Sequence, residues 1–174
     1  MDNALLSYFK EIGLNFKEYK HPAVFTVEES KFLKSKIPGM HTKSLFLKDN
    51  KSRFYLICMN AFNRLDIKSL QKYFHVEKLR FASAEELKEH LNITPGSVSI
   101  FGMIHDKTRE VSLILDKEVW LAEIVGFHPN ENTSTLEISH EDLKKFYESI
   151  ESEKQIVDLE RLSNPPKERV KKDG

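Results

Sequence analysis

Cysteine and long apolar runs are scarce in this sequence. Cys58 is the single cysteine, so an internal disulfide is excluded and a reducing, cytoplasmic setting is expected. No apolar stretch approaches the roughly 20 residues of a membrane-spanning helix, and the opening Met1-Asp2-Asn3 lacks the basic-then-apolar pattern of a secretion signal. We therefore expect a cytoplasmic protein with no membrane partner.

An excess of charge of either sign is also missing. The 174 residues contain 27 basic and 27 acidic side chains, so the whole molecule is not steered towards polyanions, although a local basic patch is still allowed. Hydrophobic residues make up 40% and charged residues 31%, as in ordinary globular proteins. We predict one domain over residues 1–162 and a basic, disordered tail over 163–174.

Capping signals and apolar periodicity predict helices scattered between strands. Thr26 with Glu29, and Ser83 with Glu86, have the capping-box spacing that starts a helix. The polar connection over 48–53 predicts a β-hairpin between two apolar runs. Segment 117–122 is ambiguous between helix and strand, and 126–132 is interpreted as a loop. Helices are expected at 2–12, 26–36, 66–74, 83–91 and 140–150, and strands or strand-like apolar runs at 16–20, 43–47, 54–59, 79–81, 98–101, 111–115 and 133–138.

This alternation of elements indicates an α+β protein, with a curved or barrel-like sheet and helices packed outside it. The segment His41–Asp49 is unusual because it places Lys43 inside an apolar strand-like run. A lysine there is costly to bury unless an anionic or carbonyl-like group meets it. The alternative is a lysine that reaches water along its own methylene stem.

Two hydrolase classes find little support in the residues. The seven histidines show no HxxxH spacing or His/Cys cluster, which argues against a metal site. Cys58 is flanked by Leu56, Ile57 and Met59, which indicates a buried strand thiol rather than a nucleophile.

Five segments in register carry a family resemblance. They are HTKSLFLKD (41–49), TPGSVSIFG (94–102), FHPNENTSTLEIS (127–139), His21-Pro22-Ala23 and FASAEEL (81–87). Their order and spacing resemble the YbaK/prolyl-tRNA-editing family, with greatest similarity to its freestanding, ProX-type Ala-tRNA(Pro) deacylases. The resemblance covers about residues 16–148, and 156–159 is similar to the closing strand of the family.

The resemblance implies a mixed, largely antiparallel, barrel-like sheet flanked by helices. It implies hydrolysis of the ester of mischarged tRNA(Pro), most simply Ala-tRNA(Pro), without a metal or organic cofactor. The implied partners are tRNA(Pro) and, in addition, prolyl-tRNA synthetase or other translation factors, but neither DNA nor a membrane.

The resemblance also implies a site. Lys43 and His128 match the catalytic positions of the family, Lys43 as a fixed positive charge for the ester carbonyl or the neighbouring phosphate. Expected substrate-binding residues are Ser44, Gly96, Ser97, Asn132 and Thr133; Lys48, Lys78 and Arg80 are weaker candidates for tRNA contact, with a solvated charged rim as the alternative.

Ser44 departs from the family pattern, in which asparagine usually follows the lysine. A serine makes fewer directed hydrogen bonds than asparagine, so alanine is the expected amino acid, with cysteine and serine as the alternatives. A synthetase pocket built for proline cannot strongly exclude a smaller side chain, because missing methylenes are worth only about 1–3 kcal/mol. A catalytically weak module that binds aminoacyl-tRNA and docks on a synthetase is the competing interpretation.

Overall fold

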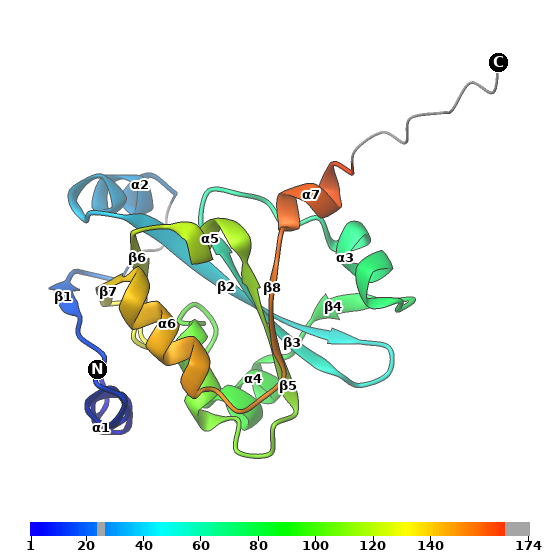
Figure 1. The fold of residues 1–174 in the computed structure, drawn as a ribbon, viewed down its shortest axis with the longest axis horizontal. Helices are drawn as coiled ribbons and strands as arrows, with labels where there is room; N and C mark the ends of the chain where they lie inside the picture. The colour runs from blue at the N-terminus through cyan, green and yellow to red at the C-terminus, as the bar shows by residue number, and fades with distance from the viewer. Residues whose placement is uncertain (24–26, 166–174) are drawn as a thin grey trace.

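An eight-stranded mixed β-sheet organises the chain in our computed structural model, which describes residues 1–23 and 27–165 (Figure 1). The strand order is β1-β7-β6-β2-β3-β5-β8, with β4 paired to β2. Four pairings are antiparallel and three are parallel. The predicted α+β class, with a mixed, largely antiparallel sheet flanked by helices, is confirmed. In the described part of the chain β1 and β8 are the two ends of the path, so the sheet is curved and open rather than a closed barrel. The strands are β1 (Lys17–Lys20), β2 (Met40–Asp49), β3 (Phe54–Asn60), β4 (Leu79–Phe81), β5 (Val111–Asp116), β6 (Ile124–Phe127), β7 (Ser134–Ser139) and β8 (Lys154–Val157).

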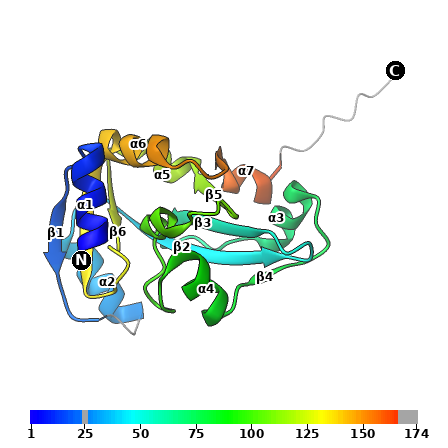
Figure 2. The same cartoon turned by 90° about the horizontal axis from the view of Figure 1, so that it is seen from below.

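Strand β2 belongs to both halves of the sheet. Its first residues pair with β6, and its residues from Thr42 to Lys48 pair with β3 in the predicted hairpin. In Figure 2, β1 and β6 lie on one side of the molecule and β3, β4 and β5 on the other, with β2 crossing between them. A single strand therefore joins the two parts, and its side chains contact both.

The alternation of β3 separates two hydrophobic cores. Leu56 and Cys58 point into the larger core, which helices α1, α4, α5 and α6 cover, whereas Ile57 and Met59 point into a smaller core under α3 and α7. All four side chains are fully buried or nearly so. Because neighbouring strand residues face opposite sides, the same alternation applies to β2. The helices are α1 (Asn3–Ile12), α2 (Val27–Lys36), α3 (Ile67–Phe74), α4 (Ala84–Leu91), α5 (Lys117–Leu121), α6 (His140–Ser149), α7 (Leu159–Ser163) and a 3-10 helix, η1 (Ile100–His105).

Capping explains most helix starts. Asp2, Asp66 and Ser139 each accept a hydrogen bond from a backbone N–H of the first turn, and Ser83 with Glu86 forms the full predicted capping box. Thr26 of the other predicted box, and most of the predicted tail (166–174), lie outside the described residues. Within residues 1–23 and 27–165, every helix is too short or too polar to cross a membrane.

Three local expectations change. The apolar run 98–101 does not form a strand: it leads into η1, whose Ile100, Phe101 and Met103 are buried against the larger core. The ambiguous segment 117–122 is helix α5. The predicted loop 126–132 begins later, because Gly126 and Phe127 belong to the short strand β6. A Cβ at Gly126 would lie 3.3 Å from the Thr135 methyl group, so glycine here permits close packing of β6 on β7.

Candidate functional site

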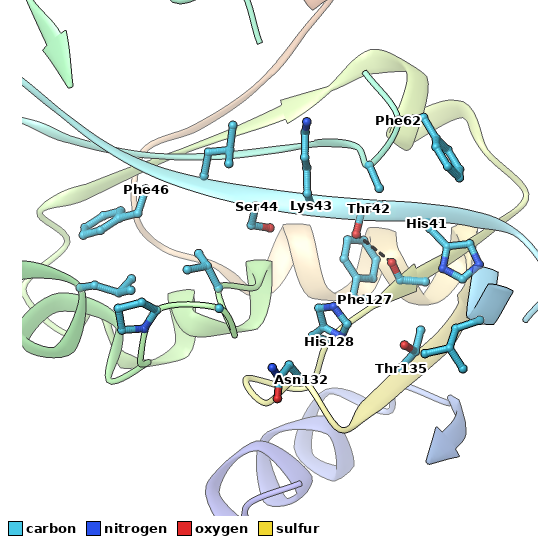
Figure 3. A pocket seen from close by; sticks show the side chains of 18 of the residues that line it. His41, Thr42, Lys43, Ser44, Phe46, Phe62, Phe127, His128, Asn132 and Thr135 are labelled. Carbon is cyan, nitrogen blue, oxygen red and sulfur yellow. Dashed lines mark hydrogen bonds between the residues drawn. The ribbon is translucent and has the colours of Figure 1, made fainter. Parts of the chain in front are cut away.

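A cleft opens where one edge of β2 has no neighbouring strand. β6 pairs with β2 at Met40 and His41, and β4 pairs with it only from Leu47 onwards. Between these two pairings, residues 43–45 border a cavity of about 960 Å³ (Figure 3). It is lined by β2, by the end of β6 and the loop after it, by α2 and by the 94–98 turn.

The backbone of Ser44 faces this open edge. The carbonyl of His41 accepts from Ala61 N–H at 2.8 Å, and Asp49 N–H donates to Arg53 at 3.0 Å, so the odd-numbered residues of β2 direct their backbone groups towards β3. Ser44 is opposite Cys58 in the register, and the two form a non-hydrogen-bonded pair. The backbone N–H and C=O of Ser44 are therefore directed away from β3 and into the cleft. The cleft thus has polar backbone groups as well as side chains.

The inner face of β2 carries Thr42, Ser44 and Phe46. Thr42 Oγ1 donates to the Gly126 carbonyl at 2.7 Å, which ties β2 to β6 at the point where the two strands separate. Ser44 is only 8% exposed and contacts the Cys58 thiol. Burial raises the pKa of Cys58 to about 12, although hydrogen bonds with Ser44 and Thr42 oppose this rise. A thiol that is fully buried and protonated cannot serve as a nucleophile.

His128 lies across the cleft from Ser44, just after β6 (Figure 3). Its Nδ1 is 3.0 Å from the Ser134 carbonyl oxygen, and because a carbonyl only accepts, Nδ1 donates the proton. In the neutral ring Nε2 therefore carries the lone pair. The ring of His21 lies edge-on at 6.3 Å, and His21 Nε2 is 2.9 Å from Thr135 Oγ1. The hydrogen bond to Ser134 thus sets the tautomer of His128, and the ring of His21 packs beside it.

Lys43 projects from the outer face of β2, away from Ser44 and His128 (Figure 3). It is opposite Met59 in the register, on the side of the smaller core. Partial burial lowers the pKa of its ammonium group. Within residues 1–23 and 27–165, no carboxylate lies within ion-pair distance of Lys43. Its cationic group is thus held near the cleft mouth without a described acidic partner.

The other predicted substrate-binding residues divide into two groups. Gly96 and Asn132 line the cleft with Ser44, and Gly96 has a φ of +89° with open space where a Cβ would stand. Ser97 and Thr133 do not line it. Ser97 N–H donates within its own turn to Thr94 at 3.3 Å, and the Thr133 carbonyl accepts from His21 N–H at 2.9 Å.

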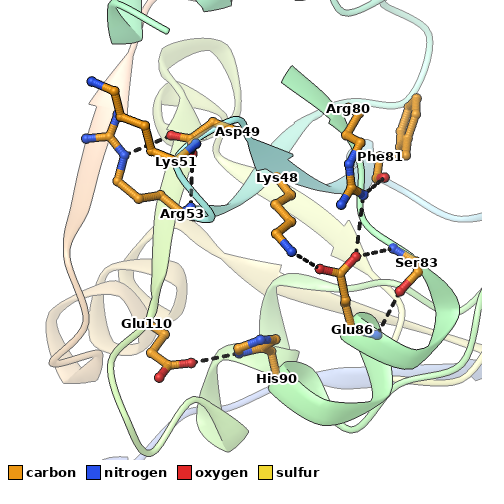
Figure 4. Close-up of polar contacts among 10 residues, drawn as sticks. All are labelled: Lys48, Asp49, Lys51, Arg53, Arg80, Phe81, Ser83, Glu86, His90 and Glu110. Atoms are coloured by element: carbon orange, nitrogen blue, oxygen red, sulfur yellow. Dashed lines mark hydrogen bonds and ion pairs between the residues drawn. The ribbon is translucent and has the colours of Figure 1, made fainter. Parts of the chain in front are cut away.

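Two of the three predicted tRNA-contacting cations are paired with one carboxylate (Figure 4). Glu86 lies 2.6 Å from Lys48 Nζ and 3.4 Å from Arg80 Nη1. The hydrogen bond from Lys48, helped by those from Ser83, lowers the pKa of Glu86 to about 2. Lys78 is exposed and makes no ion pair with a described residue. Lys48 and Arg80 therefore brace β2, β4 and α4.

Sequence reasoning did not assign several of the cleft residues. Thr42 is on the same face as Ser44 by strand alternation, so the period of two was a usable signal. His21 and Thr135 meet only through the pairing of β1 with β7. Phe62 and Phe81 line the cleft and stay largely exposed; Phe81 begins one of the segments that resemble the family, but neither ring was assigned to the site.

Comparisons with known proteins agree with this geometry. Residues 21–146 match the family model of the aminoacyl-tRNA editing domain. The prolyl-tRNA editing protein ProX of Acetoanaerobium sticklandii is 36% identical over 143 residues, which cover 82% of this chain and 87% of that protein. The prolyl-tRNA synthetase associated domain-containing protein 1 of Danio rerio is 33% identical over 146 residues, covering 83% and 79% respectively.

A solved structure has the same fold. It was described as a candidate trans-editing enzyme for prolyl-tRNA synthetase, and it superposes with a TM-score of 0.69 at 20% identity. The match covers 91% of this chain and 98% of that one.

Proposed function

Because the chain belongs to the aminoacyl-tRNA editing domain family, we propose that it is a trans-editing deacylase that hydrolyses mischarged tRNA(Pro), with Ala-tRNA(Pro) as its substrate. The observation that carries this proposal is the cleft at the open edge of β2, which joins Ser44, His128 and Gly96 in one cavity. The similarity to ProX, named for prolyl-tRNA editing, supports the choice of tRNA.

The reaction is ester hydrolysis. A water oxygen forms a bond to the carbonyl carbon, the bond to the ribose oxygen breaks, and the water proton passes to that oxygen to regenerate a hydroxyl. An aminoacyl ester is already activated, so positioning and charge stabilisation supply the catalysis. The chain needs no covalent nucleophile for this step, which fits the inert Cys58.

His128 is proposed to orient the water, the substrate amino group or the terminal hydroxyl through its Nε2. The hydrogen bond from Nδ1 to Ser134 keeps the ring in one orientation. The glycine turn at Gly96 lets a ligand approach the backbone closely, and Asn132 borders the same space. Together these groups surround the aminoacyl end of the substrate.

The sequence left two roles for Lys43, the ester carbonyl or the adjoining phosphate. The side chain leaves β2 on the face opposite to Ser44 and His128 (Figure 3), which favours the phosphate. A cation there holds the terminal nucleotide while the amino acid occupies the inner face.

The amino-acid preference is proposed to depend on Ser44. Its side chain is part of the floor of the cleft and is already in contact with Cys58. A shorter residue than the usual asparagine leaves more room and one polar contact fewer, so cysteine and serine esters are the nearest competitors of alanine. Mischarged tRNA(Pro), prolyl-tRNA synthetase and a cytoplasmic location complete the proposal.

The test is deacylation of Ala-, Pro-, Cys- and Ser-tRNA(Pro) by the wild type and by Lys43→Ala. We expect rapid loss of alanine alone, and a decrease of roughly 10- to 150-fold in the variant, the equivalent of losing one hydrogen bond to a charged group, about 1.5–3 kcal/mol. Lys43→Arg keeps the positive charge and serves as the control. Binding of the tRNA with no hydrolysis of any ester would reject the deacylase and favour the binding module.

A further inference from the structure

Two largely exposed aromatic rings border the cleft. Phe62 is 63% exposed and Phe81 is 57% exposed, and both border the cavity. Rings of this size are normally buried. Two of them beside one cleft therefore need an explanation that single exposed apolar residues do not need.

These rings lie on the outer face of β2 together with Lys43 and Leu45. Figure 3 places Phe62 on the same side of the strand as Lys43. At the other end, Phe81 is opposite Leu47 in the pairing with β4, and cross-strand partners share a face. We call Phe62, Lys43, Leu45 and Phe81 the outer strip.

The outer strip has the length and the order of groups that an unpaired nucleic acid strand requires. The backbone N–H of Ala61, which precedes Phe62, donates to the His41 carbonyl, and Leu47, the partner of Phe81, is six positions after His41. At about 3.3 Å per residue this is about 20 Å. A cation lies between the two rings, so bases can stack at the ends while a phosphate meets the ammonium group.

We propose that the outer strip binds the unpaired 3′-terminal nucleotides of the tRNA, with Phe62 and Phe81 stacking on bases and Lys43 contacting the phosphate between them. This inference rests on the proposed function, because it assumes that the ester in the cleft is carried by tRNA. It assigns a nucleic-acid-binding role to two residues that had none.

The charge distribution favours an unpaired strand over a long helical contact. The chain has equal numbers of basic and acidic residues, and Lys48 and Arg80 are already engaged by Glu86. A stem bound along many phosphates needs several free cations, whereas stacking on rings needs few. The Arg80 side chain also donates to the Phe81 carbonyl at 3.0 Å, which holds the backbone of Phe81 in place.

The experiment measures the Kd of an uncharged acceptor-stem RNA microhelix, once with its four unpaired 3′ nucleotides and once with a blunt end, by fluorescence anisotropy. The proteins are the wild type, Phe62→Ala, Phe81→Ala and Leu121→Ala. Leu121 is the matched control, because it is 65% exposed on α5 and does not border the cleft. Melting curves verify that each variant is folded.

We expect each phenylalanine variant to weaken binding of the tailed RNA roughly 5- to 150-fold, the equivalent of one lost stack. Leu121→Ala should bind the tailed RNA like the wild type. Phe62→Trp keeps a ring for stacking and should also keep the wild-type affinity that Phe62→Ala loses. Binding of the blunt RNA should change little in any variant.

Tailed RNA that binds both phenylalanine variants within twofold of the wild type would overturn the proposal. So would an equal loss for tailed and blunt RNA. Hydrolysis of Ala-tRNA(Pro) is measured in parallel to separate the two ideas. Hydrolysis by the wild type without ring-dependent binding rejects the outer strip alone, whereas ring-dependent binding without hydrolysis rejects the deacylase alone.

Discussion

The two faces of β2 differ sharply along the same few residues. On the inner face, Ser44 is 8% exposed, and Thr42 is bonded to β6. On the outer face, Lys43 has no acidic partner among residues 1–23 and 27–165, and the rings of Phe62 and Phe81 are 63% and 57% exposed. Around Ser44 the inner face is enclosed and hydrogen-bonded, whereas the outer face is cationic at Lys43 and becomes apolar at Leu47, which is 0% exposed in the smaller core.

This difference shows how one short strand can serve a substrate with two chemically distinct ends. Alternation sends neighbouring side chains to opposite faces, and the missing strand between β6 and β4 leaves an open edge over which a ligand can pass. An aminoacyl group on the inner face and a nucleotide strand on the outer face would be joined across that edge. The backbone N–H and C=O of Ser44 lie at this open edge, where the ligand would pass from one face to the other.

The largest expected effect that tests this comparison is on the pH dependence of hydrolysis. Burial lowers the pKa of Lys43 from its ordinary 10.5, so its charge is lost at a lower pH than that of a free lysine. After subtraction of uncatalysed hydrolysis, the rate should fall about tenfold per pH unit above that lowered pKa. Rates measured from pH 6 upwards provide the check.

Lys43→Arg is the control, because arginine stays charged and should remove the falling limb. The sign for stability is opposite. The unfolded chain binds more protons between the lowered pKa and 10.5, so the free energy of unfolding rises with pH in that window. A wild-type limb that survives in Lys43→Arg would assign the titration to another group.

Ser44→Asn should change the inner face only. The larger side chain meets Cys58 in a buried position, so we expect a loss of about 1–3 kcal/mol in the free energy of unfolding, with the fold retained and the preference among Ala-, Cys- and Ser-tRNA(Pro) altered. Ser97→Asn is a matched control, because Ser97 is 9% exposed but outside the cleft lining. An unchanged preference and rate in Ser44→Asn would place Ser44 outside the substrate pocket.

Thr42→Val tests the hydrogen bond that joins β2 to β6. The bond from Thr42 Oγ1 to the Gly126 carbonyl is 2.7 Å long, and its loss should cost about 1 kcal/mol of unfolding free energy. Hydrolysis should slow several-fold because the loop with His128 follows β6, while affinity for the tailed microhelix should hold. Urea titration and single-turnover rates provide the measurements, and a loss of RNA affinity alone would contradict the assignment of the two faces.

Glu86→Gln has the smallest expected effect. The variant keeps the helix cap but loses the ion pairs with Lys48 and Arg80. We therefore expect the free energy of unfolding to decrease by less than about 1 kcal/mol. Because the pKa of Glu86 is about 2, the contribution in the wild type is present above pH 4.5 and is lost as the pH falls towards 2.

The same variant tests the predicted tRNA contacts of Lys48 and Arg80. Freeing these cations should tighten RNA binding and steepen its salt dependence if they face the stem. Unchanged affinity and salt dependence would show that they serve only to brace β4 and α4.

The amino-acid sequence by itself determined most of the local elements and pointed to the family. Capping signals at Asp66, Ser83 and Ser139 place helix starts correctly, since they depend on residues three apart. The hairpin of β2 and β3 also follows from its polar connection. The alternation that separates Lys43 from Ser44 is likewise a property of the strand alone.

Only the tertiary structure decided where the cleft opens and which groups meet in it. β6 is four residues long, and its partner residues in β2 lie more than 80 positions earlier in the sequence, so no local pattern reveals it. The pairing of Glu86 with Lys48 arises in the same way, from the packing of α4 on β2. The free edge of β2 exists because its pairing with β6 ends at His41 and its pairing with β4 begins only at Leu47. Such a register is set by long-range contacts that no short stretch of sequence contains.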